Sequence, residues 1–213
     1  MILLHPSSVG KIMTEPTAAA KKAGEVLSVG AKTYLKAIAQ GVVYGFMKEI
    51  DVKCMRKGIA CEQQSIDLLN YVLFQSYTKN TQRIETDLFT GECDILTDAY
   101  VRDIKTSWDI STFPSLQEDA HDKDYEWQGR AYMHIYNRPM FHLDYCMVTT
   151  PPELRPYEQA ELHEVDHIDP RLRVTTISYA RDAELEEALL AKARAAQKYI
   201  ESIKFQILEE HEV

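Results

Sequence analysis

Two carboxylates and a lysine, Asp94, Asp103 and Lys105, lie in the segment from Gly91 to Ser107. Side chains alternate along a β-strand, so Asp103 and Lys105 would share one face, and Asp94 on a preceding strand could lie beside them. Carboxylates that converge with a lysine can bind a divalent metal and position a water nucleophile. The alternative is a cross-strand salt bridge on a solvated face.

A hairpin is the predicted structure for this segment. Thr90-Gly91 and Thr97-Asp98 are turn signals, and the runs after each of them are short and rich in β-forming residues. We therefore expect one strand near 92–97 and another near 100–106.

A third carboxylate, Glu62, interrupts the apolar face of an expected helix from Val52 to about Tyr77. The apolar positions follow helical steps of three and four: Met55, Ile59, Ile66, Leu69 and Leu73. Burying an ionised carboxylate costs several kcal/mol unless a cation or hydrogen bonds compensate. We interpret Glu62 as a third metal ligand, and the alternative is a core-edge glutamate paired with a nearby arginine.

The first part of the chain is predicted to be mainly helical and is relatively basic. Ser7 or Ser8 could cap a helix through Met13, and a second helix would cover about 31–40, with a loop over 14–30. The lysines of this region could form a solvated face or an edge that faces phosphate.

The remaining elements are three strands and two helices. The patterns predict strands at 83–89, 140–150 and 171–178 and helices at 124–137 and 181–210.

This order, with the hairpin included, predicts an α/β (α+β) fold with a mixed central sheet flanked by helices. At 213 residues, one domain is expected, with a helical part over 1–80, a core sheet over 81–150, and a strand and long helix over 151–213.

Composition narrows the class of protein. The chain is 45% hydrophobic, has no apolar run near membrane-spanning length, and its opening is too short for a signal peptide. Its four cysteines form no Cys-x-x-Cys pair, so neither a disulfide framework nor a zinc ribbon is indicated. We expect a soluble cytoplasmic protein that does not associate with membranes.

The net charge of −9 argues mildly against a nucleic-acid-binding protein, because phosphate contacts need Lys and Arg. A metal-dependent nuclease concentrates carboxylates at its site, however, and much of the acid lies at Glu184–Glu187 and Glu209–Glu212, where we expect the periphery. The charge does not decide the function.

Four short motifs together resemble the PD-(D/E)XK nuclease superfamily, in the branch of the lambda-type (YqaJ-like) phage exonucleases and RecB-type nucleases. They are Gly58–Glu62, Gly91–Asp94, Asp103–Lys105 and Gln128–Tyr132, and the opening Pro6–Met13 also resembles phage-encoded members. The resemblance covers most of residues 5–150 and implies a restriction-endonuclease-like core, whereas the long C-terminal helix is predicted from the helical pattern over 181–210 alone.

The resemblance implies a metal site. Glu62, Asp94 and Asp103 would hold one or two Mg²⁺ ions, with Mn²⁺ as an alternative and the backbone carbonyl of Ile104 as a further ligand. Many relatives carry Glu at the position of Asp103, and this shorter side chain could alter the metal spacing. No cysteine spacing matches an iron–sulfur cluster, so none is expected.

The same resemblance gives roles to three further side chains. Lys105 would orient or deprotonate the attacking water, while Gln128 and Tyr132 would brace the lysine and the DNA backbone. Because Gln128 and Tyr132 are four apart on the expected helix, both can reach the same neighbour.

Candidate DNA contacts lie on two expected helices. Arg56 and Lys57 open the helix that carries Glu62, near the expected path of an anionic strand. Weaker candidates near the start of the chain are Ser7, Ser8 and Lys11.

The function implied is that of a metal-dependent DNA exonuclease from a phage or prophage, acting on linear double-stranded DNA in recombination within a bacterial host. A single-strand annealing protein would be its partner by analogy. The C-terminal helix could serve a homo-oligomer or pack on its own sheet.

A rival signature is His163-Glu164-Val-Asp-His167, which matches the His-Glu-x-x-His of zinc metalloproteases. Pro170 would end any helix there, and Asp166 puts a charge at a spacer position, so a polar turn or short helix is the simpler interpretation. A non-catalytic DNA-binding protein with a vestigial nuclease site is a third hypothesis, against which the retained lysine argues.

Overall fold

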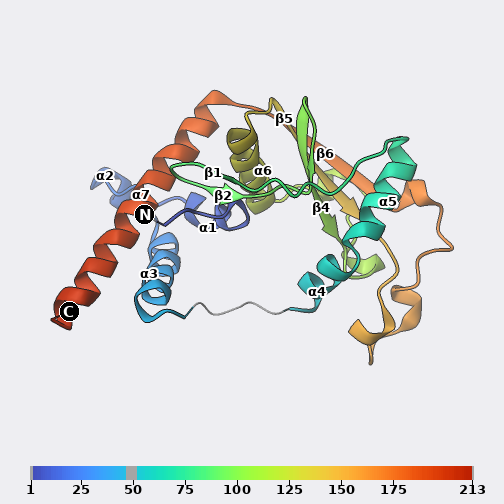
Figure 1. The fold of residues 1–213 in the computed structure, drawn as a ribbon, viewed down its shortest axis with the longest axis horizontal. Coiled ribbons are helices and arrows are strands. Elements are labelled where there is room, and N and C mark those ends of the chain that lie inside the picture. Colours follow the sequence, from blue (N-terminus) through green and yellow to red (C-terminus); the bar gives the residue numbers. More distant parts are fainter. Residues whose placement is uncertain (1, 47–51, 213) are drawn as a thin grey trace.

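The computed structural model describes residues 2–46 and 52–212, so the part of the predicted helical region at 47–51 lies outside the described residues. A mixed sheet of four strands forms its centre (Figure 1), in the order β3-β4-β5-β6. The strands are β3 (Ile95–Leu96), β4 (Tyr100–Thr106), β5 (Met140–Cys146) and β6 (Val174–Ala180). Only the β4–β5 pair is parallel. The predicted mixed sheet is confirmed.

Helices cover both faces of this sheet. Helix α6 (Lys123–Tyr136) joins the parallel strands β4 and β5 and packs on one face, where Val101 and Leu143 enter the main hydrophobic core. Helix α5 (Glu62–Leu73) packs on the other face, where Ile95 and Cys146 belong to a second, smaller core. Parallel strands need such a crossover, and the α6 connection supplies it.

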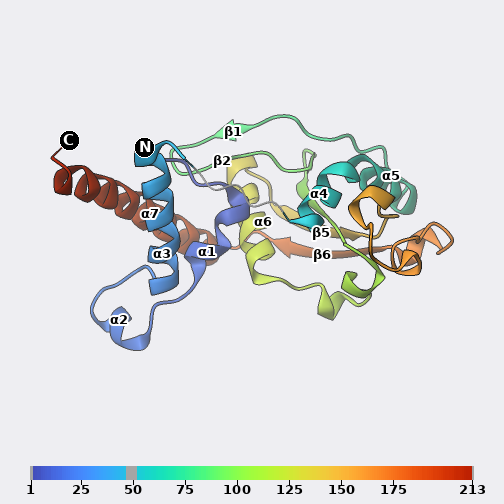
Figure 2. The same cartoon turned by 90° about the horizontal axis from the view of Figure 1, so that it is seen from below.

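Different helices lie at the two ends of the molecule (Figure 2). Helices α1 (Gly10–Met13), α2 (Ala18–Lys22) and α3 (Val29–Tyr44) lie with most of α7 (Ala183–Glu210) at one end, and α4 (Lys53–Ala60) lies with α5 at the other. No helix among residues 2–46 and 52–212 is long and apolar enough to cross a membrane.

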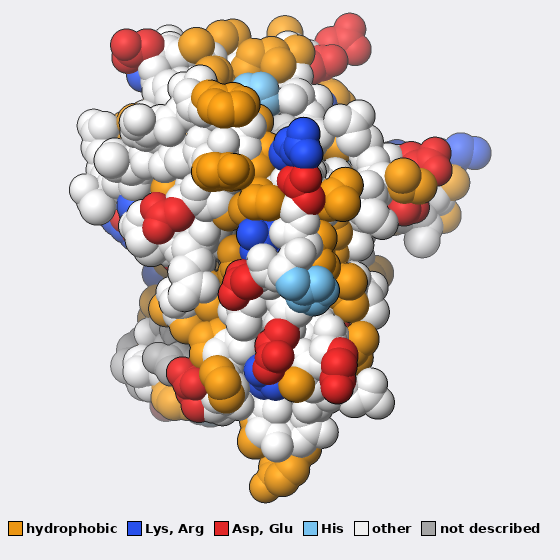
Figure 3. Space-filling model, turned by 90° about the vertical axis from the view of Figure 1, so that its right-hand side faces the viewer, with side chains coloured by type: hydrophobic (Ala, Val, Ile, Leu, Met, Phe, Trp, Pro, Cys, Tyr) orange, Lys and Arg blue, Asp and Glu red, His pale blue; other side chains and the backbone are white. Residues whose placement is uncertain are grey.

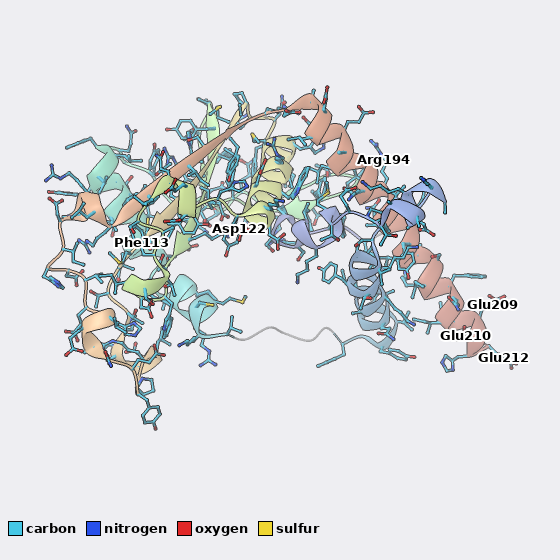
Figure 4. All side chains as sticks on the ribbon, turned by 180° about the vertical axis from the view of Figure 1, so that it is seen from behind. Phe113, Asp122, Arg194, Glu209, Glu210 and Glu212 are labelled. Atoms are coloured by element: carbon cyan, nitrogen blue, oxygen red, sulfur yellow. The ribbon has the colours of Figure 1, made fainter. Side chains whose placement is uncertain are left out.

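The prediction of a long C-terminal helix is confirmed by α7. Its N-cap is Asp182, it packs mainly against α3, and its buried apolar residues recur at helical spacing: Leu189, Ala193, Ala196 and Ile200. The acidic Glu209, Glu210 and Glu212 lie at its far end (Figure 4), as expected for that segment. In the other acidic segment, Glu186 is instead partly buried against Arg181 and His134.

The predicted helix over 52–77 is wrong in its middle. Cys61, with φ −109° and ψ 11°, separates α4 from α5, so the apolar stripe does not continue across it. Ile66 and Leu69 are buried on α5, whereas Ile59 on α4 is 80% exposed. Because of this break, α4 and α5 are two separate helices, and the side chains of α4 do not continue the buried face of α5.

The remaining differences concern short elements. Thr90-Gly91 is not a turn but strand β2, which pairs with β1 (Ile84–Glu85) in a separate two-stranded sheet, so 83–89 does not join the central sheet. The region 14–30, expected as a loop, contains α2 and the start of α3.

The ends of several strands also differ from the predictions. The first hairpin strand is only β3, β5 ends before the predicted 150, and β6 begins and ends later than 171–178. Short 3₁₀ turns fill much of the connections: Pro6–Ser8, Ile110–Thr112, Gln117–Asp119, Pro152–Leu154, Ala160–Leu162 and Pro170–Leu172. The predicted serine cap is wrong, because His5 caps the first of these turns and the serines lie inside it.

Candidate active site

The open edge of β4 is the feature on which the site is built. Strand β3 pairs only with Val101 and Arg102, so the following residues of β4 have no strand on that side. There the backbone N–H of Ile104 donates a 2.6 Å hydrogen bond to Asp94 Oδ2. A strand residue directs its N–H and C=O to the same edge, so the carbonyl of Ile104 faces this side as well.

Glu62 and Asp94 meet across a lysine that the sequence patterns did not indicate. Glu62 is the first residue of α5, and Asp94 directly precedes β3. The ammonium of Lys79 donates to Asp94 Oδ1 at 2.7 Å and to Glu62 Oε1. The alternative for Glu62, pairing with a nearby cation, is therefore observed, with a lysine in place of an arginine.

Asp103 and Lys105 share one face of β4, as the alternation predicted. Lys105 Nζ lies 2.7 Å from Asp103 Oδ2 and donates to Gln128 Oε1 at 3.1 Å. Gln128 in turn donates to Asp103 Oδ1 at 2.9 Å. Asp103 Oδ2 is buried and accepts no well-aligned hydrogen bond, so its contact with Lys105 is mainly an ion pair.

Burial and charge set the protonation of this pair. Burial raises the pKa of Asp103 to about 6, although the Lys105 ammonium opposes that rise. Burial alone would lower the pKa of Lys105, but the Asp103 carboxylate outweighs it and raises that pKa. Lys105 is thus an ammonium near neutral pH, better suited to stabilise negative charge than to remove a proton.

Helix α6 positions Gln128 by packing closely on the sheet. A Cβ at Gly129 would lie 1.9 Å from the Phe141 ring, so only glycine permits this approach. Gln128 Nε2 also lies 3.5 Å from the hydroxyl of Tyr132. Gln128 and Tyr132 are 4% and 2% exposed: Gln128 braces Lys105 and Asp103 from within, and Tyr132 lies against Gln128, while their contact with the DNA backbone stays a prediction.

Tyr125, one turn before Gln128, is a further residue that the sequence patterns did not indicate. Its ring lies 4.3 Å from Lys105 Nζ. The i−3 spacing from Gln128 could have revealed it.

A cleft of about 340 Å³ opens onto these groups. It is lined by Cys54, Met55, Gly58, Ile59, Glu62, Asp94, Ile104, Lys105, Thr106 and Tyr125. Helix α4 forms one wall, where Met55 and Ile59 are 50% and 80% exposed. One wall of the cleft is therefore apolar and the other carries the charged groups.

Lys57 is not available to DNA, contrary to prediction. Its side chain is fully buried, and Nζ donates to the carbonyls of Ser107, Trp108 and Val148 at 2.7–2.9 Å. Burial lowers the pKa of Lys57 to about 8, which leaves it charged at neutral pH. The break at Cys61 lets α4 direct this lysine inward.

The other candidate DNA contacts lie at or near the surface. Arg56 is exposed on α4, Ser7 is exposed and Ser8 half-buried. Lys11 is exposed, with Nζ 4.6 Å from the centre of the Tyr34 ring.

The His163–His167 segment lacks the helix that a zinc-protease signature requires. His163 follows a 3₁₀ turn and is buried, whereas Glu164 and His167 are exposed. This segment and α5 form an end of the molecule where hydrophobic side chains lie among acidic and basic ones (Figure 3).

His163 instead belongs to a second polar cluster, with Asp109 and Glu158. Among the described residues, one donor atom from each lies within 4.8 Å of the others, close enough to hold an ion. The two ring nitrogens of His163 contact Thr150 Oγ1 at 3.0 Å and Glu158 Oε2 at 3.1 Å.

Comparisons with known proteins were made with both sequence and fold. No known protein-family profile matches the sequence, and no curated protein is detectably similar. The fold is similar to the crystal structure of a phage-related exonuclease from Haemophilus somnus 129PT, with 30% identity, a TM-score of 0.90, and coverage of 97% of this chain and 96% of that one.

A second similar fold is the alkaline exonuclease LHK-Exo from Laribacter hongkongensis, with 15% identity, a TM-score of 0.71, and coverage of 99% and 94% of the two chains. The same enzyme in complex with dAMP gives a TM-score of 0.71 at 15% identity, with coverage of 98% and 93%. These two matches concern the fold alone. The likeness to the Haemophilus protein, at 30% identity over nearly the whole of both chains, shows that the chain belongs to the phage-related exonucleases of the PD-(D/E)XK superfamily.

Proposed function

We propose that the protein is a metal-dependent DNA exonuclease whose single nuclease domain spans residues 1–213. The observation that carries the proposal is the meeting of Asp94, Asp103 and Lys105 at the open edge of β4, beside a cleft. Carboxylates and an ammonium at one strand edge suit phosphodiester hydrolysis, because the reaction needs charge stabilisation on phosphate and a positioned water.

The donor set fits Mg²⁺, with Mn²⁺ as an alternative. Glu62, Asp94 and Asp103 offer carboxylate oxygens, and the Ile104 carbonyl lies at the same edge. Asp103 Oδ2 already faces a cation, the Lys105 ammonium at 2.7 Å, so the fit rests on the oxygen donors themselves. When bound, the ion would supply Lewis-acid polarisation of the phosphate and a more acidic water.

Residues of the chain would position the reacting groups. Lys105 would place its ammonium next to the phosphate oxygens where negative charge develops, and Gln128 would hold both Lys105 and Asp103 in position. Tyr132, whose pKa burial raises, stays protonated and would brace Gln128.

The cleft suits a polynucleotide end. Its apolar wall at Met55 and Ile59 can contact bases, and the charged wall can take the phosphate. Arg56 on α4, with Ser7, Ser8 and Lys11, would contact the backbone of DNA entering the site. A structure of the similar alkaline exonuclease contains dAMP, which is consistent with a nucleic-acid substrate for this fold.

We further propose that the substrate is linear double-stranded DNA and that the enzyme acts in phage or prophage recombination in the bacterial cytoplasm. A single-strand annealing protein would be its partner, and homo-oligomerisation would use exposed surface of α7. The phage-related relative supports this setting.

The test is digestion of end-labelled linear duplex and of closed circular DNA, with Mg²⁺ or with EDTA. We expect the linear DNA alone to be degraded, only with the metal, and Lys105→Met to lower the rate about a thousandfold. Lys204→Met is the matched control, since Lys204 pairs with Glu201 on α7. Cleavage of circles would remove the exonuclease assignment, and unimpaired cleavage by Lys105→Met would remove the mechanism.

A further inference from the structure

Lys79 holds the carboxylate oxygens that a metal would need. Its ammonium contacts one oxygen of Glu62 and one of Asp94, from a segment between α5 and β1 that has no regular secondary structure. Lys105, by contrast, contacts Asp103 and Gln128. The two lysines therefore neutralise different parts of the same site.

The contact has a clear electrostatic effect. Two carboxylates that reach the same ammonium are close enough to repel each other when that ammonium is removed. Burial disfavours the charge of Lys79, but Asp94 and Glu62 together outweigh it and raise the pKa of the lysine. Lys79 thus compensates this part of the site with a cation that belongs to the chain.

The backbone around Lys79 is fixed on both sides. The N–H of Tyr77 donates to Asn70 Oδ1 at 2.7 Å, and the N–H of Asn80 donates to the carbonyl of Asp94 at 2.7 Å. The Lys79 side chain is 28% exposed and has four rotatable carbon bonds. A rotamer change can therefore withdraw the ammonium while the main chain stays in place.

We propose that Lys79 is a displaceable counter-cation that competes with the divalent metal for Glu62 and Asp94. It holds the two carboxylates together until the metal binds, and it withdraws towards solvent when they become ligands. This inference rests on the proposed metal site. It adds an exchange of one cation for another before catalysis can begin.

The proposal predicts the sign of a change in metal affinity. A ligand set that is available only part of the time binds more weakly, in proportion to the available fraction. Lys79→Met should therefore bind Mn²⁺ about tenfold more tightly than the natural chain, whereas Lys79→Arg, which keeps the cation, should not. If Lys79 instead orients the ligands, its loss would weaken binding.

The experiment is titration of the full chain with Mn²⁺ alone, without DNA, with the free ion followed by electron paramagnetic resonance. Lys204→Met is the matched control, because its side chain is 25% exposed and its partner Glu201 is 45% exposed, against 28% and 40% for Lys79 and Glu62. Asp94→Asn should lose affinity. Lys79→Ala serves as a second variant should Lys79→Met fold poorly.

Thermal unfolding gives an independent readout. In EDTA, Lys79→Met should melt at a lower temperature than the natural chain, and Mn²⁺ should restore more stability to the variant than to the natural chain. If Lys79→Met and Lys79→Ala both bind Mn²⁺ no more tightly than the natural chain, this inference is wrong, but the proposed metal site stands. Absence of Mn²⁺ binding by the natural chain overturns the proposed metal site, and this inference with it.

Discussion

Two polar clusters in the described part of the chain bring carboxylates and basic groups together, and we propose that the one at the edge of β4 is the active site. In the cluster of Asp109, Glu158 and His163, many polar atoms have partners within the protein: Asp109 Oδ1 accepts from the Ser111 hydroxyl and from the N–H of Thr112. Glu158 accepts from Lys53 at 2.7 Å and from Trp108 at 2.8 Å, and both nitrogens of His163 contact oxygens. That cluster is a satisfied network that fixes the segment after β5.

The cluster at the edge of β4 is different. Three of its carboxylates, from Glu62, Asp94 and Asp103, pair with lysine ammoniums, and Glu62, Asp94 and Lys105 line a cleft. Its cations, Lys79 and Lys105, come from flexible side chains that can exchange partners. The difference between the two clusters is therefore access to the cleft, and not the proximity of donor atoms.

The largest expected effect is at Asp103. Asp103→Asn keeps the shape of the side chain but removes the charge, and we expect cleavage of end-labelled duplex to fall about a thousandfold or more. The melting temperature should change little, since Gln128 can still bond the amide. A rate within tenfold of the natural enzyme would contradict the distinction between the clusters.

The second prediction concerns Lys57, whose buried ammonium we expect to contribute to stability. Lys57→Met would leave the buried carbonyls of Ser107 and Val148 without their donor, while that of Trp108 keeps the bond from Thr150 Oγ1. At about 1–3 kcal/mol for each lost donor, we expect a loss of at least ~2 kcal/mol in the free energy of unfolding. Urea denaturation measures this. The control is Lys53→Met on the same helix, whose 58% exposed side chain should contribute no more than about 1 kcal/mol. Equal costs for the two lysines would show that the buried bonds are not formed.

The pH dependence of metal binding sharpens the comparison further. Metal binding requires the ionised carboxylate, and burial raises the pKa of Asp103 to about 6. Affinity for Mn²⁺ should therefore be nearly constant above pH 7 and should fall by up to about tenfold per pH unit below pH 6. Affinity that stays constant down to pH 5 would exclude Asp103 as the titrating ligand.

The smallest expected effect on activity is at the second cluster. His163→Ala should leave cleavage within about twofold of the natural rate, but it should cost about 1–3 kcal/mol of stability because the buried Thr150 hydroxyl and the half-buried Glu158 lose their contacts with the ring. His167→Ala, at an exposed position, should change neither quantity. A large loss of cleavage, or peptidase activity that depends on zinc, would reverse our assignment of the two clusters.

The features that the sequence predicted are those encoded by local periodicity. Alternation along β4 placed Asp103 and Lys105 on one face, and the four-residue spacing on α6 placed Gln128 beside Tyr132. The helical pattern over 181–210 predicted the extent of α7.

What the sequence did not predict depends on contacts between distant parts of the chain. Lys57 appeared to be an exposed basic residue, because nothing nearby shows the carbonyls that surround it. Lys79 lies in a segment without periodicity, and its partners are 15 and 17 positions away. The break at Cys61 likewise follows from the separate packing of α4 and α5, since both sides of it have helical patterns.

The bonds of Lys57 also have a consequence for the order of folding. Its three acceptors are 50, 51 and 91 positions further along the chain, so they can form only after long loops have closed. We therefore expect α4 to dock late, after the sheet has formed. Because α4 provides one wall of the cleft, a nascent or partly folded chain would lack a complete substrate channel, and nucleolytic competence would arise only with the last stage of folding.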